Sequence, residues 1–95
     1  MISAVGKLGP GERLSDLIGP EAVYVYRWVP DYAGTEIRPG DYVLLDPEEG
    51  RHYGGPHGKR LIARVPAKLL EYRQGNEYKF VGERPKRAYD SGRQP

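Results

Sequence analysis

Residues 22–29 alternate between two kinds of side chain, and this pattern constrains the fold more than any other feature of the chain. Valines share one face with Arg27, and aromatic rings share the other. The aromatic face consists of Tyr24, Tyr26 and Trp28. A period of two predicts a β-strand, in which successive side chains point to opposite faces. A charge on the valine face is costly unless it is paired or meets a ligand, so Arg27 requires an explanation.

A second strand is predicted at residues 76–81, and it also carries a charged residue that requires an explanation. Glu77 shares its face with Val81, whereas Tyr78 and Phe80 point to the other side. Arg27 and Glu77 therefore stand out as two opposite charges on strands at the two ends of the central part of the chain. We expect them either to pair with each other or to face a common ligand.

A short helix is predicted ahead of the first strand. Leu14, Leu17 and Ile18 have the i, i+3, i+4 spacing of one helix face, and Gly19 followed by Pro20 is a strong stop signal. With the two strands, this pattern predicts an α+β fold: a small, mostly antiparallel β-sheet with one or two short helices.

Turn residues separate the remaining elements. Pro39 and Gly40 suit the central positions of a type II turn that leads into a strand. Asp46 and Pro47 suit the N-cap and first position of a second short helix. The remaining expectations are a strand at residues 59–65 and a polar bend at residues 71–75.

Length and composition favour one turn-rich domain over a helix bundle. The chain has 95 residues, of which 13 are Gly and 9 are Pro, and a domain of this size buries roughly 60–65% of its unfolded surface. The chain has no Cys and no apolar run of roughly 18–20 residues. These features predict a cytoplasmic protein without a membrane span.

The charge of the chain is concentrated at one end. The formal net charge is +2, and residues 83–95 hold four basic and two acidic side chains, so the rest of the chain is neutral. We therefore predict a globular domain over residues 1–82 and a flexible basic tail over residues 83–95. Nucleic acid is expected to contact only this tail.

An ordered set of short segments resembles small phage-type ADP-ribosyltransferase-like domains. The resemblance covers about residues 24–81. Its segments are YRWVP at residues 26–30, IRPGDYV at 37–43, RHYG at 51–54, RVPA at 64–67 and GNEY at 75–78. It implies a domain that binds NAD as its substrate and transfers ADP-ribose to a host protein, in the cytoplasm of a bacterial host.

The resemblance also implies roles for individual residues. Arg27 would match the first-strand arginine that holds a phosphate or ribose of NAD, which suits the fork of a guanidinium. Tyr53 would match an aromatic that stacks on the nicotinamide, with Trp28 beside it. Glu77 would match the catalytic glutamate, which stabilises the positive charge on the ribose as nicotinamide leaves.

Each of these residues also has a structural interpretation, and the chain has alternative functions. Arg27 would then pair with Glu77, Asp41 or another acid, Glu77 would cap or pair structurally, and Tyr53 would be a packing tyrosine. Leu44 stands where many members of the family have Ser or Thr, which fits an inactive phage protein that binds and inhibits a host antiviral-defence protein, as anti-CRISPR proteins do. A nucleic-acid-binding β-barrel is a third alternative.

The two histidines do not predict a metal site. His52 and His57 are five residues apart, no Cys is present, and the acidic residues nearby are scattered. A zinc site normally uses three or four protein ligands at a recognisable spacing. The prediction is that the chain holds no metal.

Overall fold

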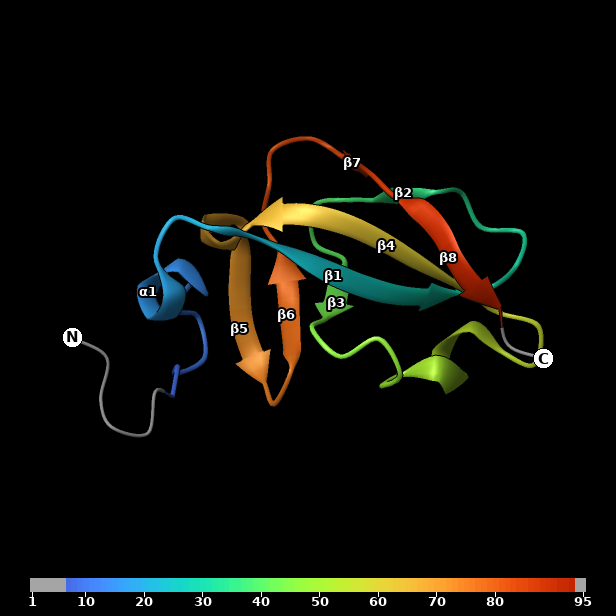
Figure 1. Cartoon of the computed structure of the whole chain (residues 1–95), viewed down its shortest axis with the longest axis horizontal. Coiled ribbons are helices and arrows are strands. Elements are labelled where there is room, and N and C mark those ends of the chain that lie inside the picture. Colours follow the sequence, from blue (N-terminus) through green and yellow to red (C-terminus); the bar gives the residue numbers. More distant parts are fainter. Residues whose placement is uncertain (1–6, 94–95) are drawn as a thin grey trace.

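One antiparallel sheet of six strands forms the framework of the molecule (Figure 1). The structure is a computed structural model, and it describes residues 7–93. The strand order is β5-β6-β3-β1-β4-β8, and β2 and β7 pair separately. The strands are β1 (Ala22–Val29), β2 (Glu36–Ile37), β3 (Tyr42–Leu44), β4 (Lys59–Pro66), β5 (Leu70–Gln74), β6 (Glu77–Phe80), β7 (Lys86–Arg87) and β8 (Tyr89–Arg93). The predicted α+β class is confirmed.

One short helical segment precedes the first strand, and two others lie between strands. They are α1 (Ser15–Ile18), η1 (Arg51–Gly54) and η2 (Ala67–Leu69), of which the last two are 3-10 turns. Gly19 ends α1 with a φ of 84°, and Gly40 has a φ of 94° in the predicted turn before β3. Both positions need glycine, because other residues rarely adopt a positive φ.

The hydrophobic core covers one face of the sheet. Val25 and Val29 of β1 are buried, and so is the inward row of β4 beside them. Phe80 from β6 and Ile37 from the β2–β7 ribbon complete the same cluster. The other face of β1 carries Tyr24, Tyr26 and Trp28, as the alternation predicted.

Two local predictions are wrong. The polar bend expected at residues 71–75 is strand β5, which pairs with β6 through a two-residue loop of Gly75 and Asn76. Asp46 does not begin a helix: its carboxylate accepts a hydrogen bond of 2.9 Å from the backbone nitrogen of Glu48. This local turn competes with helix formation, and Asp and Asn side chains often make it.

The prediction of a flexible tail at residues 83–95 is also wrong for the part of it that the structure describes. Strand β8 pairs with β4, and Ala88 is buried at 2% exposure. The side chains of β8 show no apolar periodicity, because an edge strand keeps many of them in solvent. Its backbone still pairs with the free edge of β4 and satisfies the hydrogen-bonding groups there. The folded unit therefore extends at least to Arg93, and residues 94–95 lie outside the described part.

Because of Tyr78, the folding stability of the domain is expected to depend on pH in the alkaline range. Its ring is 4% exposed and meets Tyr72 edge to face at 5.4 Å. Burial, and secondarily the nearby Tyr72 hydroxyl, raise the pKa of Tyr78 above its usual 10.0. The unfolded chain therefore releases this proton at lower pH than the folded chain, so the stability that Tyr78 contributes is complete below about pH 10 and is lost as the pH rises further.

Replacing Tyr78 by Phe is expected to reduce this loss of folding stability at alkaline pH. Urea unfolding at about pH 8 and about pH 10.5 measures the change in free energy for each protein. The exposed Tyr24→Phe variant is the control, and it should lose as much stability as the wild type. An equal loss in the Tyr78→Phe variant would contradict the role of this buried hydroxyl.

Candidate functional site

The four residues selected from the sequence line a single cleft of about 260 Å³. Arg27 and Trp28 come from β1, Glu77 from β6 and Tyr53 from η1. The other lining residues are Tyr26, Val29, Pro30, Tyr42 and Leu44. Elements that are distant in sequence thus contribute two opposite charges and several aromatic rings to one hollow.

The cleft opens where β1 and β3 separate. These strands pair only at Tyr26 and Leu44, and Leu44 pairs in turn with Glu77 of β6. The three residues form a row on the aromatic face of the sheet. Because neighbouring strands lie about 4.8 Å apart, the backbones of Tyr26 and Glu77 are roughly 10 Å from each other. Arg27 lies just beyond the last paired residue and borders the cleft, but it belongs to the opposite face of β1, with Val25 and Val29, so it and Glu77 belong to opposite faces of the sheet.

Arg27 is paired with Asp41 and not with Glu77. Its Nη1 donates a hydrogen bond of 2.8 Å to the carbonyl oxygen of Tyr42, and its Nε lies 3.7 Å from the Asp41 carboxylate. The structural alternative in which Arg27 pairs with Asp41 is therefore present. Nη2 has no polar partner among residues 7–93, so one arm of the guanidinium remains available to a ligand.

Glu77 presents a carboxylate to the cleft with no protein partner in the described part of the chain. It begins β6 directly after the loop of Gly75 and Asn76, in which Gly75 has a φ of 52°. Two-residue hairpin loops commonly need such a positive φ. The tight loop fixes the position of Glu77 at the start of the strand, where the side chain is half-buried.

Trp28 and Tyr53 are two of the aromatic residues that line the cleft. Trp28 is only 7% exposed, and its Nε1 donates a hydrogen bond of 3.3 Å to the carbonyl oxygen of Pro47. Tyr53 is 72% exposed, so it contributes little to the core and is not the packing residue of the alternative interpretation. The next residue, Gly54, holds η1 against β1, because a Cβ there would lie 2.6 Å from the carbonyl oxygen of Val29.

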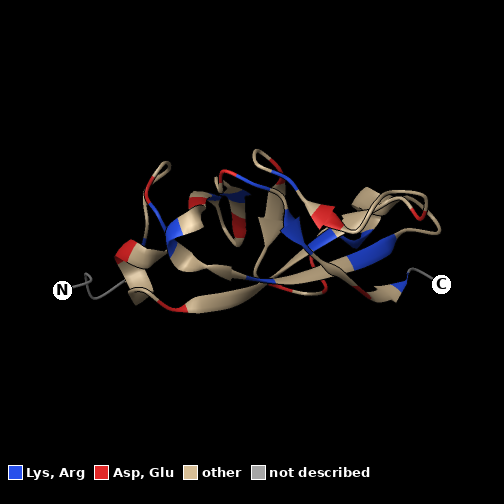
Figure 2. Ribbon diagram, turned by 90° about the horizontal axis from the view of Figure 1, so that it is seen from above, with Lys and Arg blue, Asp and Glu red and all other residues tan. Residues whose placement is uncertain are grey.

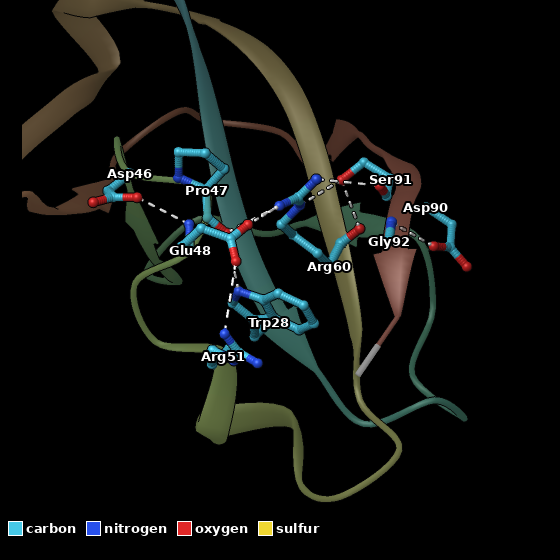
Figure 3. A network of polar contacts seen from close by, with 9 residues as sticks. All are labelled: Trp28, Asp46, Pro47, Glu48, Arg51, Arg60, Asp90, Ser91 and Gly92. Carbon is cyan, nitrogen blue, oxygen red and sulfur yellow. Dashed lines mark hydrogen bonds and ion pairs between the residues drawn. The ribbon is translucent and has the colours of Figure 1, made fainter. Parts of the chain in front are cut away.

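The sequence analysis missed the polar network behind Trp28 (Figure 3). Arg60 of β4 lies opposite Trp28 in the strand register and binds the loop around Pro47 and Glu48. On the other side it binds Ser91 of β8. Arg60 does share the period-two pattern of β4, but its partners are distant in sequence and no local pattern indicates them.

A larger hollow lies elsewhere and lacks comparable chemistry. It measures about 750 Å³ and is bordered by α1, β1 and the β5–β6 loop. Its lining is mostly apolar, and among the described residues Lys7 supplies the one charged side chain. Binding sites combine apolar walls with a few converging polar groups, and the smaller cleft has that combination.

Comparison with models of protein families, with curated proteins and with solved structures finds no match for this chain. Within residues 7–93, no helix has the length and apolar character needed to cross a membrane. In the same part of the chain, no three His, Asp or Glu side chains are grouped as metal ligands.

Proposed function

We propose that this chain is an ADP-ribosyltransferase-like domain that binds NAD in the cleft between β1 and β6. The observation that carries the proposal is the convergence of Arg27, Trp28, Tyr53 and Glu77 on that one cleft. The sequence pattern and the family resemblance single out the same four residues. A free carboxylate, a guanidinium arm and two aromatic rings are the groups that a nicotinamide nucleotide needs.

The size of the cleft indicates which part of NAD it would hold. A volume of about 260 Å³ is below the roughly 300–1,000 Å³ of typical ligand pockets, so it suits the nicotinamide and its ribose. Arg27 also lines a second hollow of about 330 Å³ with Gly34, Glu36 and Arg38. The diphosphate would then lie at Arg27, and the adenosine half would extend into the second hollow.

Glu77 would act on the ribose. As the bond between nicotinamide and C1′ breaks, nicotinamide leaves with the electron pair and the sugar becomes positively charged. A carboxylate close to the ribose stabilises that charge, and more strongly in a half-buried site than in bulk water. A nucleophile of the acceptor protein then forms the new bond to C1′ and loses its proton.

Thermal unfolding in the presence of NAD tests the binding step. NAD at about ten times its dissociation constant should add about 1.4 kcal/mol of stability, which corresponds to a Tm increase of about 5–10 °C in a domain of this size. ATP, which lacks the nicotinamide, is the control. No increase at millimolar NAD, together with no release of nicotinamide, would contradict the proposal.

Exposed tyrosines favour the second candidate, a phage protein that binds a host protein without catalysis. Tyr42 and Tyr53 line the cleft and are 45% and 72% exposed, and Tyr32 is 90% exposed. Tyrosine is enriched in protein interfaces because it combines apolar area with a hydrogen-bonding tip. Replacing Glu77 by Gln would leave such binding unchanged, whereas it would greatly slow transfer.

A nucleic-acid-binding surface has less support. Blue and red segments are interspersed along the molecule (Figure 2), and the net charge is only +2. A site that neutralises several phosphates would show a continuous basic patch and a steep dependence on salt. The cleft residues include one cation and one anion, which suits a nucleotide better than a phosphate backbone.

A further inference from the structure

Arg60 is a half-buried arginine whose side chain supports the cleft from behind. It lies on β4 opposite Trp28, its side chain is 19% exposed, and it does not line the cleft. Burial of a guanidinium is costly unless its donors are satisfied. The contacts that satisfy them therefore indicate what Arg60 holds in place.

All three nitrogens of the Arg60 guanidinium are engaged (Figure 3). Nη1 donates to the carbonyl oxygen of Pro47 at 3.2 Å and to Glu48 Oε2 at 3.0 Å. Nε donates to Ser91 Oγ at 3.0 Å, and Nη2 donates to the Ser91 carbonyl oxygen at 3.2 Å. The Ser91 hydroxyl donates back to the Arg60 carbonyl oxygen at 3.1 Å. A lysine could not reproduce this planar fork.

The same guanidinium lies beside two aromatic rings of the cleft. Its central carbon is 5.4 Å from the centre of the Tyr26 ring and 5.8 Å from that of Trp28. Both distances are within the range of a cation–π contact. The Pro47 carbonyl accepts hydrogen bonds from Arg60 and from Trp28, so arginine, ring and loop form one unit.

This unit also holds in place the segment of chain that leads to Tyr53. Glu48 pairs with Arg60 at 3.0 Å and with Arg51, the first residue of η1, at 3.8 Å. Tyr53 lies two residues further on, and its backbone nitrogen donates to the Gly50 carbonyl oxygen at 2.9 Å. Without Arg60, the Glu48 carboxylate and the Pro47 carbonyl lose their link to β4.

We propose that Arg60 is a positioning residue: it fixes Trp28 and the loop of residues 46–50, and so holds Tyr53 at the cleft. Its link to Ser91 makes strand β8 part of the same support, although β8 does not contribute to the cleft lining. The part of this inference that concerns NAD rests on the proposed function, and the part that concerns the order of the loop does not.

The test compares two lysine variants of β4. Arg60→Lys keeps the charge but loses the fork. Arg64→Lys is the matched control, because Arg64 lies on the same face of the same strand, is exposed and makes no side-chain polar contact within residues 7–93. Trp28 is the only Trp of the chain, so its emission reports NAD binding directly. Hydrogen exchange at the amides of Tyr53 and Gly55, both hydrogen-bonded, reports the order of the loop.

Arg60→Lys is expected to weaken NAD binding by about 10-fold or more, the order found when a group that orients a metal-binding residue is lost. It should also accelerate exchange at Tyr53 and Gly55 but not in the centre of β1. Arg64→Lys should change neither property. Ser91→Ala, which removes one of the acceptors of Arg60, should give a smaller effect of the same kind, and it replaces Arg60→Lys if that variant does not fold.

Two results would overturn the inference. One is wild-type exchange at Tyr53 and Gly55 in the Arg60→Lys variant. The other is equal acceleration throughout β1 and β4, which would mean that Arg60 only stabilises the whole fold. If the wild type binds no NAD, the proposed function fails, and the exchange measurement still decides whether Arg60 positions the loop.

Discussion

Replacing Glu77 by Gln is expected to slow the release of nicotinamide from NAD by about 10²- to 10³-fold, the loss typical of removing one preorganised electrostatic group. The amide has the same shape as the carboxylate but cannot stabilise a positive charge on the ribose. The dissociation constant of NAD should change little, because in this account the charge of Glu77 is needed mainly in the transition state. Nicotinamide release measured with NAD in excess gives the rate.

Glu83→Gln is the matched control for this substitution. Glu83 is an exposed carboxylate that follows β6 and lies away from the cleft, so the rate should remain at the wild-type value. A Glu77→Gln protein that releases nicotinamide as fast as the wild type would contradict the catalytic role. Equal loss in both variants would mean that net charge, and not the position of Glu77, controls the reaction.

Replacing Phe80 by Ala is expected to cost about 3–5 kcal/mol of folding free energy, as is typical of a fully buried ring. Phe80 is 2% exposed within the core cluster. Its ring fills the space over Gly82, where a Cβ would lie under 3 Å from it. A domain of this length has a total stability of roughly 5–14 kcal/mol, so the variant would lose a large share of its stability.

Urea unfolding at neutral pH measures the effect of Phe80→Ala. Tyr32→Ala is the control, because Tyr32 is 90% exposed, and surface substitutions usually change stability by less than about 0.5 kcal/mol. A loss below about 1 kcal/mol for Phe80→Ala would show that the packing around this ring is looser than the structure indicates.

Strand β1 and helix α1 could be predicted because their signals are local. The alternation of valine and aromatic residues over Ala22–Val29 gives both the strand and its two faces. In α1, the positive φ of Gly19 marks the end that the sequence predicted. In both cases the residues that decide the structure are neighbours in the chain.

Strands β5 and β8 could not be predicted because distant partners determine them. The outer half of β5 is exposed, so its side chains show no apolar pattern, and pairing with β6 makes it a strand. In β8, Ser91 is held by Arg60, which is 31 residues away in sequence. Edge strands of this kind are stabilised by backbone pairing more than by side-chain periodicity.

In the candidate site, too, some features have a local signal in the sequence and others depend on distant contacts. Arg27 and Glu77 could be selected singly, because each is a charge on a patterned strand. That they share a cleft depends on the early separation of β1 from β3, which pair at a single position. Arg60 had no such local signal, because its importance comes from contacts with Pro47 and Ser91.

NMR spectra of the nitrogen-15-labelled protein, recorded while NAD is added, test the central claim most directly, because they locate the ligand residue by residue. We expect saturable shifts of backbone amides at Arg27, Trp28, Leu44, Tyr53 and Glu77, with those of the hollow beside α1 unchanged. No shifts at millimolar NAD, or shifts confined to the hollow beside α1, would contradict an NAD site between β1 and β6.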